Sequence, residues 1–338
     1  MKSATTLGAI VAVFAFSTES VSQDFYKGAN VRFIVGYPTG ATFDTYSRLL
    51  SRHMPRHIPG RPNMIIQNMP GAGSLTATNY LANVAPKDGS VIGMPNPVNT
   101  VEPLLNPTVA RFDPRKFSWI GSMNTEISTC GFWGAKVSTF EDLRTKNVVV
   151  GSTGPSAGST LDSRLIAGVL GLNFKIVTGY PGLAEARLAA QQGEVDGHCG
   201  LTVSSLKADL WADFKKGVAK VPLQMGLKKH PDLPDVPNAF DMVKTDEDRQ
   251  VLTLIFGPWT YGRPVIGPEG VPADRLAILR TAFMAAIKDP EFTKEAEKLS
   301  LEIQPLGPEE IQKTLAEIYR TPASVVERTR KILGIVVK

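Results

Sequence analysis

The sequence predicts a two-lobed α/β protein, with two sheets flanked by helices and joined by a hinge that the chain crosses twice. Strands and helices alternate in two separate series, before and after a stretch at 95–114 that is rich in Pro and Asn. A second Pro-rich stretch at 228–237 closes the second series, and the remaining chain reads mainly as helices. A βα series framed by two such stretches is typical of one lobe inserted into another.

The first series has the βαβαβ order of a parallel sheet covered by helices on both faces. Apolar, β-branched strands are predicted at 31–36, 64–67 and 91–93. Helices follow the first two strands, over 44–57 and from Ser74. Each helix is preceded by a turn of small and polar residues, as helix starts require.

The second series follows a short apolar segment at 119–121 and repeats the same alternation. Its predicted strands are 148–151, 174–177 and 195–199, and its predicted helices are 161–170, 184–192 and 204–216. We therefore place the first lobe at 23–124 plus 228–338, and the second, inserted lobe at 125–227. The 338 residues suffice for two cores. A hinge between two such lobes places a ligand cleft between them.

Residues 1–22 are predicted to be an export signal that is cleaved near Ser22. Lys2 precedes an apolar run at 7–16, and small residues follow at 20–22. The run is about half the length of roughly twenty residues that a bilayer-spanning helix needs. We expect the mature protein in the periplasm.

The composition and the motifs argue against nucleic acid, metal and cofactor as partners. The formal net charge is +5, but the basic residues are scattered and not interleaved with aromatic ones, so nucleic acid is not an expected partner. The sequence shows no ligand spacing for zinc, no calcium loop and no P-loop, so no metal and no cofactor is predicted. We expect a monomer.

The chain has two cysteines, Cys130 and Cys199. An oxidising periplasm allows them to pair, whereas the usual state of isolated buried cysteines is a pair of free thiols. The sequence leaves both open, and we favour the free thiols slightly.

Two segments that lie far apart share one design, in which an apolar strand leads through small polar residues into a helix. They are 31–44 and 148–160. Each turn presents unpaired backbone N–H groups at a helix N-terminus, where the helix dipole favours negative charge. If the two turns face one another across the cleft, they bind a carboxylate and need not catalyse a reaction of it. Tyr37, Phe43 and Tyr180 flank the turns as candidate walls, and Asp196 lies in a buried-looking strand where it more readily orders a neighbouring loop.

An alternative interpretation is a secreted serine hydrolase. The run Gly154-Pro155-Ser156-Ala157-Gly158 matches the G-x-S-x-G nucleophile elbow and follows a strand. Such an enzyme needs a histidine base, and the four candidates are His53, His57, His198 and His230. His53 and His57 precede the serine, Asp196 lies too close to His198 to serve it, and His230 lies in a Pro-rich linker. We therefore assign no catalytic residue and expect a protein that is not an enzyme.

The motifs together resemble the substrate-binding proteins of tripartite tricarboxylate transporters, the Bug or TctC family. The resemblance rests on the ordered set Val-Gly-Tyr-Pro-Thr-Gly-Ala-Thr-Phe-Asp at 35–44, Gln-Asn-Met-Pro-Gly-Ala-Gly-Ser at 67–74, Ala-Pro-Lys-Asp-Gly at 85–89, Val-Gly-Ser-Thr-Gly at 150–154, Gly-Glu-Val-Asp at 193–196 and Leu-Pro-Asp-Val-Pro at 233–237. Val-Pro-Ala at 271–273 and Lys-Asp-Pro-Glu at 288–291 extend it towards the end of the chain.

The resemblance implies a two-lobed periplasmic binding protein of the type II fold. Such a protein holds a small organic carboxylate, either a di- or tricarboxylate or an aromatic acid, and delivers it to the membrane permease subunits of a tripartite transporter. The candidate ligand-binding residues that it implies in the first loop are Tyr37, Thr39, Gly40, Thr42, Phe43 and Asp44. Those in the second loop are Ser152, Thr153, Gly154, Ser156, Ser159 and Thr160. Asp196 matches the acid of the family's Gly-x-Val-Asp segment, and Tyr180 stays a candidate wall.

The sequence departs from the family at both loops. Ala41, Thr42 and Phe43 occupy a stretch that is commonly glycine-rich, so that a ring intrudes on the pocket and favours an aromatic or longer acid, or packs against the opposite lobe. The second loop carries Pro155, and Asp162 stands near where many members have His. The identity of the ligand stays open. A sensor subunit that hands the same solute to a signalling receptor is a further alternative.

Overall fold

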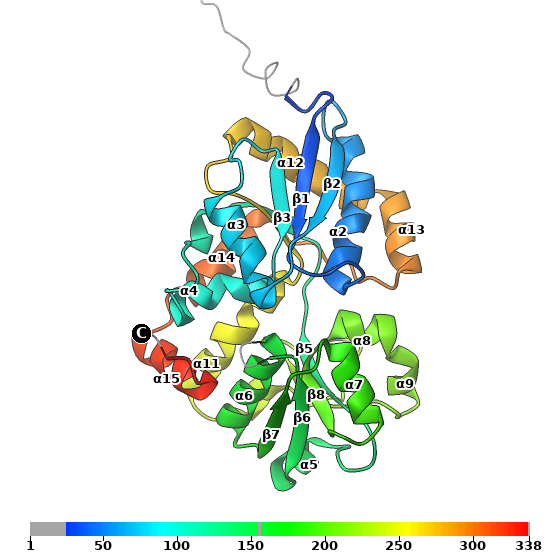
Figure 1. The fold of residues 1–338 in the computed structure, drawn as a ribbon, viewed down its shortest axis with the longest axis vertical. Helices are drawn as coiled ribbons and strands as arrows, with labels where there is room; N and C mark the ends of the chain where they lie inside the picture. The colour runs from blue at the N-terminus through cyan, green and yellow to red at the C-terminus, as the bar shows by residue number, and fades with distance from the viewer. Residues whose placement is uncertain (1–24, 155–156, 337–338) are drawn as a thin grey trace, which may run out of the picture.

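The computed structural model describes residues 25–154 and 157–336 and has two lobes, each built around one five-stranded sheet (Figure 1). The first sheet has the strand order β2-β1-β3-β10-β4 and the second β7-β6-β8-β5-β9. The predicted fold class is thereby confirmed. The predicted signal at 1–22 lies outside the described residues.

The first sheet consists of β1 (Asn30–Val35), β2 (Asn63–Asn68), β3 (Val91–Met94), β4 (Ser118–Ser122) and β10 (Pro264–Gly267). Strand β1 runs parallel to both β2 and β3, and Val35 pairs with Asn68 on one side and with Met94 on the other. The helices of this lobe are α2 (Thr42–His53), α3 (Leu75–Asn83), α4 (Glu102–Leu105), α12 (Ala273–Lys288), α13 (Pro290–Lys298) and α14 (Pro308–Ile318). The carboxyl ends of three parallel strands therefore meet at one edge of the sheet, next to the start of α2.

The second sheet consists of β5 (Ser128–Phe132), β6 (Val148–Ser152), β7 (Phe174–Thr178), β8 (Gly197–Thr202) and β9 (Lys220–Met225). Strand β6 runs parallel to β7 and β8, and Ser152 pairs with Thr178 at its carboxyl end. The helices here are α5 (Phe140–Thr145), α6 (Gly158–Leu170), α7 (Leu183–Gln191), α8 (Val203–Asp209) and α9 (Trp211–Lys215). The second loop thus leaves the sheet at the same kind of edge as the first.

Neither sheet is wholly parallel, which differs from the prediction. Strand β10 is antiparallel to β3 and β4, and β5 is antiparallel to β8 and β9. Both strands follow a crossing between the lobes, and the sequence pattern predicted neither. The β5 residues Ser128-Thr129-Cys130-Gly131-Phe132 are all buried although several are small or polar, so hydrophobicity does not mark them.

Two chain segments connect the sheets. Residues 123–127 lead from β4 to β5, and residues 226–263 lead from β9 to β10 through α10 (Ala239–Met242), α11 (Asp246–Phe256) and the 3-10 helix η5 (Gly257–Tyr261). The predicted lobe boundaries at 124/125 and 227/228 lie within these segments, and as domain limits they stay a prediction.

The C-terminal helix α15 (Ala323–Leu333) packs against α4, α6 and α11, and so touches both lobes (Figure 1). Arg330 donates to the carbonyls of Leu104 (2.6 Å) and Leu105 (3.0 Å) in α4, and Arg164 of α6 donates to that of Leu333 (2.8 Å). The prediction placed all of 228–338 in the first lobe. The apolar face of α15, which carries Val325, Val326 and Leu333, is buried among these contacts. The assignment of this helix to the first lobe stays a prediction.

Cys130 and Cys199 form a disulfide, so the expectation of free thiols was wrong. The two residues face one another in the antiparallel pairing of β5 with β8, and both are fully buried. Because the sequence pattern did not predict β5, it could not bring the two sulfurs together. In the described part of the chain, no helix is both long and apolar enough to span a bilayer.

Candidate functional site

The candidate site lies where the carboxyl ends of the parallel strands in the two sheets approach each other. The first loop joins β1 to α2, beside Asn68 of β2. The second joins β6 to α6, and the residues that follow β7 bond to it, because Gly179 and Tyr180 both donate to the carbonyl of Ser152. Ligands of open α/β sheets bind at such carboxyl ends.

Helices α2 and α6 both begin without a side-chain cap. The N-cap residues are Ala41 and Ala157, whose side chains carry no hydrogen-bonding group. The first N–H groups of a helix need partners, and serine, threonine or aspartate usually supplies them at the N-cap. Two helices of 12 and 13 residues therefore each present an uncapped N-terminus at the carboxyl edge of their sheet.

The first loop is held in shape by the buried carboxylate of Asp44. Gly40 adopts φ +85° and donates its N–H to Asp44 Oδ2 (2.9 Å), which also accepts from Arg48 Nε (2.8 Å). Asn68 donates its side-chain N–H to Asp44 Oδ1 (2.9 Å), and its Oδ1 accepts a hydrogen bond from Thr39 Oγ1 (3.2 Å). Burial alone would raise the pKa of Asp44, but these hydrogen bonds outweigh it and lower the pKa. Asp44 therefore positions the loop.

Two aromatic rings of the first loop stack on each other. The centroids of Tyr37 and Phe43 are 4.4 Å apart, and Asn96 donates to the Tyr37 hydroxyl at 2.6 Å. The guanidinium of Arg263 lies 4.2 Å from the Phe43 ring centroid. Burial raises the pKa of Tyr37 to about 12. Phe43 is thus packed between groups of the protein, with 7% of its surface exposed.

The second loop is organised by hydroxyl groups. Ser152 is fully buried, and its Oγ lies 2.6 Å from that of Ser159 and 2.5 Å from Thr160 Oγ1. Thr160 donates in turn to the carbonyl of Gly154 (2.6 Å). These bonds fix the turn around half-buried Thr153 and Gly154. The remaining candidate, Ser156, lies outside the described residues.

The start of α8 connects the two loops. A side chain at Gly200 would meet Ser159, so the end of β8 lies against the start of α6. Two residues further on, Thr202 Oγ1 lies 3.0 Å from Ser205 Oγ. Ser205 Oγ lies 3.2 Å from Thr42 Oγ1, the first residue of α2. The structure therefore brings Thr42 of the first lobe to the edge of the second sheet at which α6 begins.

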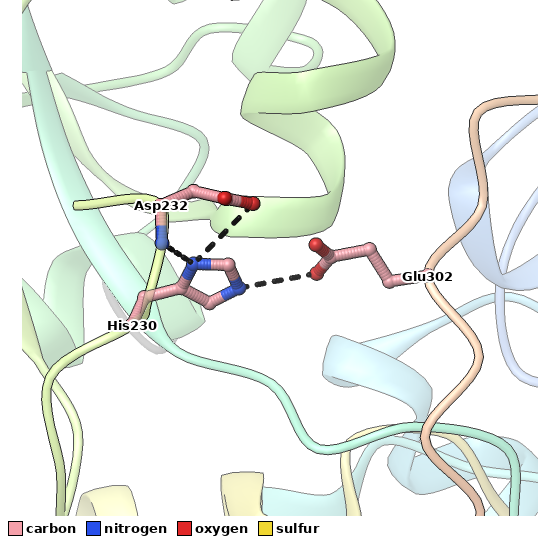
Figure 2. A group of neighbouring side chains, drawn as sticks. All are labelled: His230, Asp232 and Glu302. Carbon is pink, nitrogen blue, oxygen red and sulfur yellow. Dashed lines mark hydrogen bonds and ion pairs between the residues drawn. The ribbon is translucent and has the colours of Figure 1, made fainter.

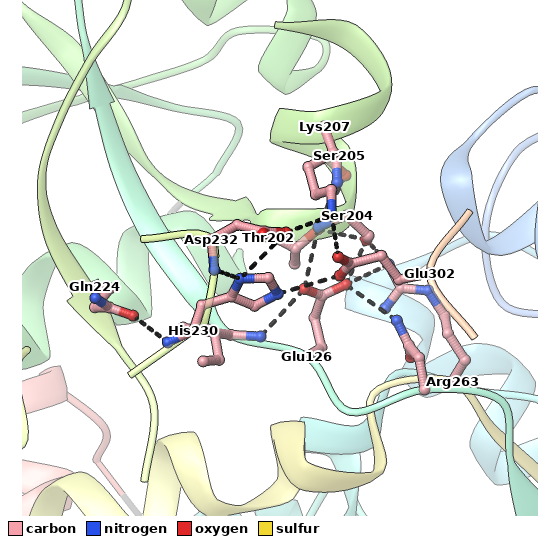
Figure 3. A network of polar contacts seen from close by, with 12 residues as sticks. Glu126, Thr202, Ser204, Ser205, Lys207, Gln224, His230, Asp232, Arg263 and Glu302 are labelled. Atoms are coloured by element: carbon pink, nitrogen blue, oxygen red, sulfur yellow. Dashed lines mark hydrogen bonds and ion pairs between the residues drawn. The ribbon is translucent and has the colours of Figure 1, made fainter. Parts of the chain in front are cut away.

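A buried ion pair lies behind this contact, at the hinge (Figure 3). Arg263 Nη2 lies 3.2 Å from Glu126 Oε2. Arg263 exposes 1% of its surface and Glu126 exposes 2%. Ser204 donates its N–H to Glu126 Oε1 (3.2 Å) and its hydroxyl to Oε2. Arg263 also donates to Ser204 Oγ (2.9 Å) and lies 5.0 Å from the ring centroid of Tyr46. Both crossing segments and both lobes meet in this cluster.

A second, more exposed network crosses between the lobes at Glu302, in the loop after α13 (Figures 2 and 3). Lys207 of α8 donates to Glu302 and, at 2.6 Å, to Asp232. His230 Nδ1 accepts the N–H of Asp232 (3.1 Å), so Nε2 carries the proton that faces Glu302 Oε2 at 3.3 Å. His230, Asp232 and Glu302 have the donor atoms and the spacing for a metal ion. The Lys207 ammonium, however, already supplies a positive charge to both carboxylates.

Two predicted site residues direct their side chains to other partners in the second lobe. Asp196 precedes β8 and accepts from Val149 N–H (2.7 Å) near the start of β6, and from Lys136 (2.7 Å). It is therefore at the opposite end of β6 from Ser152. Tyr180 has its backbone beside Ser152, but its hydroxyl donates to Glu194 (2.7 Å). Both side chains thus have partners within the second lobe. A role of either in ligand binding stays a prediction.

The described contacts of the four histidines place none of them at the second loop. His53 pairs with Glu295 at 2.6 Å and His57 with Asp289 at 3.2 Å. His198 is buried in β8 and stacks on Trp133 at 5.6 Å, and burial lowers its pKa to about 4. His230 belongs to the network of Glu302. Within the described residues, the hydrolase interpretation thus lacks a base beside the loop.

Sequence reasoning missed Glu126 and Arg263. Each lies in one of the two crossing segments, where no periodic pattern surrounds it, and the local sequence gives no signal that marks either residue.

No family model matches the chain. Among curated proteins, it is 23% identical over 319 residues to the UPF0065 protein in the gbd 5′ region of Cupriavidus necator, which covers 90% of this chain and 89% of that protein. It is also 23% identical over 335 residues to the UPF0065 protein in the tcbD–tcbE intergenic region of Pseudomonas sp. strain P51, with 96% and 92% covered.

Solved structures agree over nearly the whole chain. A TctC solute binding protein from Polaromonas has a TM-score of 0.66 at 16% identity, covering 90% of this chain and 99% of that one. The periplasmic binding protein BugD has a TM-score of 0.67 at 20% identity, covering 93% and 100%. MatC from Rhodopseudomonas palustris, solved with bound malate, has a TM-score of 0.64 at 20% identity, covering 90% and 99%.

The chain therefore has the two-lobed fold of periplasmic binding proteins. Within that class, its structural neighbours are TctC and Bug proteins and its curated relatives are UPF0065 proteins, so the resemblance indicated by the sequence motifs is confirmed.

Proposed function

We propose that this protein is a periplasmic receptor that captures a small organic carboxylate between its lobes. It then delivers the carboxylate to the membrane permease of a tripartite tricarboxylate-type transporter. The observation that carries the proposal is the pair of uncapped helix starts, Ala41 before α2 and Ala157 before α6, at the carboxyl edges of two sheets. Thr42 Oγ1 of the first lobe lies 3.2 Å from Ser205 Oγ of the second, so the two edges are in contact.

A carboxylate is the ligand that these helix starts favour. Its oxygens accept hydrogen bonds from N–H groups and hydroxyls, and the helix dipoles add attraction for its charge. Charge-assisted hydrogen bonds contribute roughly 1.5–3 kcal/mol each, and micromolar binding requires about −8 kcal/mol. A few such bonds with some apolar burial are sufficient for a receptor.

The comparisons support the ligand class and the compartment. MatC, whose fold this chain shares, was solved with malate, and BugD is a periplasmic binding protein. The Lys2-led apolar run at the N-terminus agrees with export. Delivery to a permease rests on the resemblance to the tripartite transporter family.

A ligand screen tests the proposal, because a ligand that binds only the folded state raises the apparent melting temperature. The panel contains mono-, di- and tricarboxylates, including malate and aromatic acids, and their neutral amides. We expect at least one acid to raise the melting temperature and its amide to leave it unchanged. Stabilisation by the amide to the same degree, or by no acid at all, would contradict the proposal.

The variant Thr42→Val tests the place of the site. The change keeps the shape of the side chain and removes the hydroxyl at the start of α2. We expect binding of the acid to weaken by about tenfold, equivalent to about 1.4 kcal/mol, without loss of stability in the free protein. Isothermal titration and thermal melts measure the two effects.

The matched control is Thr314→Val, in which a half-buried threonine of α14 loses a hydroxyl that bonds to the carbonyl of Glu310. Its affinity for the acid is expected to equal that of the parent protein. If Thr42→Val retained full affinity, the first loop would not bind the ligand.

A further inference from the structure

The segment 207–229 of the second lobe carries an excess of positive charge. It contains six lysines and two aspartates, and so holds four of the five formal net positive charges of the chain. Trp211 and Phe214 lie among these lysines, so the expectation that basic and aromatic residues are nowhere interleaved was wrong. The segment spans the end of α8, α9 and β9, and α8 and α9 lie against each other on one flank of the lobe (Figure 1).

Few carboxylates neutralise these lysines. Lys207 pairs with Asp232 at 2.6 Å and with Glu302. In the described part of the chain, the other five form no ion pair, namely Lys215, Lys216, Lys220, Lys228 and Lys229. Four of these five are exposed and Lys220 is half-buried. Three further carboxylates lie in or beside the segment and reduce its charge without cancelling it, at Asp209, Asp213 and Asp235.

Two aromatic rings form the base of this flank. Trp211 and Phe214 of α9 are half-buried, and their ring centroids lie 5.3 Å apart. Both rings pack on the apolar core of the second lobe. The Lys215 ammonium lies 4.7 Å from the Trp211 ring centroid, and the Lys207 ammonium lies 5.7 Å from it. Lysines and rings therefore share one surface.

The turn after α9 adds an exposed apolar side chain to this surface. Val218 exposes 52% of its surface, and its N–H donates to the carbonyl of Asp213 (2.8 Å), which fixes the turn. Lys220 donates to the carbonyl of Gly217 in the same turn. We define the basic-aromatic patch as Trp211, Phe214, Lys215, Lys216, Val218 and Lys220.

We propose that the basic-aromatic patch docks this protein on the surface of an anionic phospholipid bilayer. Negatively charged headgroups attract each lysine that lies near them. Aromatic side chains favour the boundary between headgroups and acyl chains, and an exposed aliphatic side chain such as Val218 enters the same region. The patch thus combines the charge and the apolar surface that binding at a membrane surface requires.

The composition of the patch favours a lipid surface over an acidic protein. Protein interfaces are enriched in Arg, whose planar fork binds carboxylates with two hydrogen bonds, and are depleted in Lys. Segment 207–229 contains lysines and no arginine. A lysine is a point charge on a flexible stem, which suits a fluid layer of headgroups that has no fixed positions for its partners.

The inference goes beyond the proposed function, because it concerns a flank of the second lobe and involves neither the cleft nor its ligand. For a receptor that delivers its ligand to a membrane permease, such docking keeps the protein beside the bilayer in which the permease lies. The two proposals can therefore fail independently.

Vesicle sedimentation measures the docking of the protein without residues 1–22. One set of vesicles is phosphatidylcholine alone, and the other contains about 30% phosphatidylglycerol, which supplies the negative charge. At about 0.1 M salt we expect binding to the anionic vesicles to be at least tenfold stronger than to the neutral ones. At about 0.5 M salt the difference should largely disappear, since screening shortens the range of the attraction.

The double variant Lys215→Gln/Lys216→Gln removes two charges from exposed positions of the patch. We expect its binding to anionic vesicles to be about tenfold weaker or more. The matched control is Lys175→Gln/Lys331→Gln, which removes two exposed lysines from β7 and α15, away from α9 (Figure 1). It has the same net charge as the patch variant and should bind within about twofold of the parent protein.

Several results would overturn the inference. They are equal binding to the two kinds of vesicle, no binding to either, and a patch variant that binds as well as its control. Soluble polyglutamate is the competitor at equal negative charge. If it binds the patch as tightly as the anionic vesicles do, the patch recognises an acidic polypeptide and the lipid proposal is wrong. The carboxylate screen is unaffected by any of these results.

Discussion

Two buried aspartates of the candidate site, Asp44 and Asp162, respond to burial in opposite ways. Asp44 accepts hydrogen bonds from Gly40, Arg48 and Asn68, and its pKa is lowered. Asp162 accepts one from Ser128, and its pKa is raised. Three donors, one of them the charged Arg48, outweigh the burial of Asp44, because each bond to the ionised form offsets part of the desolvation cost. The single hydroxyl donor of Asp162 does not outweigh its burial.

The raised pKa of Asp162 predicts a pH effect on the stability of the free protein. The folded pKa is about 7 and the unfolded value near 3.8, so the folded state binds this proton more tightly. The favourable contribution is complete below about pH 4 and is lost as the pH rises towards 7. Asp162→Asn does not titrate. Its unfolding free energy relative to the parent should therefore increase by about 3 kcal/mol between pH 4 and pH 7.5.

Urea unfolding of the parent and of Asp162→Asn at both pH values measures this difference. The contributions of the other carboxyl groups are the same in both proteins and therefore cancel. Asp209→Asn should show almost no change between the two values, since the residue is exposed. A flat difference for Asp162→Asn would mean that the carboxyl is well solvated in the free protein.

Single residues were predictable where the local sequence determines their role. The loop residues from Tyr37 to Asp44 follow a strand and precede a helix, so their place at a helix start could be read from composition. Glu126 and Arg263 could not be found in this way, because their partners come from segments more than fifty residues away in the chain, such as Ser204.

At the scale of elements, the helices of the candidate site were predicted to within three residues of their starts. Helix α2 begins at Thr42 where Asp44 was expected, and α6 begins at Gly158 where Leu161 was expected. Strands β5 and β10 were missed because they are short and buried on both faces without an alternating pattern. Tertiary contacts, which the local sequence does not encode, determine these two strands.

The polar network at Glu302 links α8 of the second lobe with the loop after α13 of the first. Burial would raise the pKa of Glu302, but hydrogen bonds from His230 and Lys207 outweigh it, so the pKa is lowered. A carboxyl with a lowered pKa contributes stability above its unfolded value, about 4.5, and loses it as the pH falls through the folded value. The network therefore strengthens the contact between lobes at neutral pH.

We expect Lys207→Met to lower the unfolding free energy by about 1 kcal/mol at pH 7, since the side chains are partly exposed. The loss should shrink at pH 3.5 and in 1 M salt. Thermal or urea unfolding under the three conditions measures it. Lys313→Met, at an exposed position of α14, is the control. A loss that is the same at both pH values would indicate packing of the lysine stem as the cause.

At the scale of the whole molecule, the lobes are joined by more than the two crossing segments. Helix α15 returns from the first lobe to lie against α6 while Arg330 still bonds to α4. The sequence predicted two α/β lobes and their order, because alternation of strands and helices is a local signal. It did not predict which lobe the last helix contacts, since an amphipathic helix fits any apolar surface within reach.

Arg330→Met tests the structural role of this third connection. Removing the bonds to the carbonyls of Leu104 and Leu105 should lower the unfolding free energy by about 1–2 kcal/mol, as measured by urea unfolding. Arg320→Met, in which the replaced side chain is exposed, should cost less than about 0.5 kcal/mol. Equal losses in the two variants would show that the carbonyl bonds add nothing beyond a surface charge.

The bond between Cys130 and Cys199 closes a loop of 69 residues inside the second sheet. Cross-links of this kind contribute typically 2–4 kcal/mol, and only where thiols are oxidised. A newly made chain in a reducing cytoplasm lacks that contribution and so resists unfolding less. Under the export proposed above, a precursor that passes a translocation pore as an extended chain benefits from this lower stability. Oxidation after crossing then stabilises the folded protein.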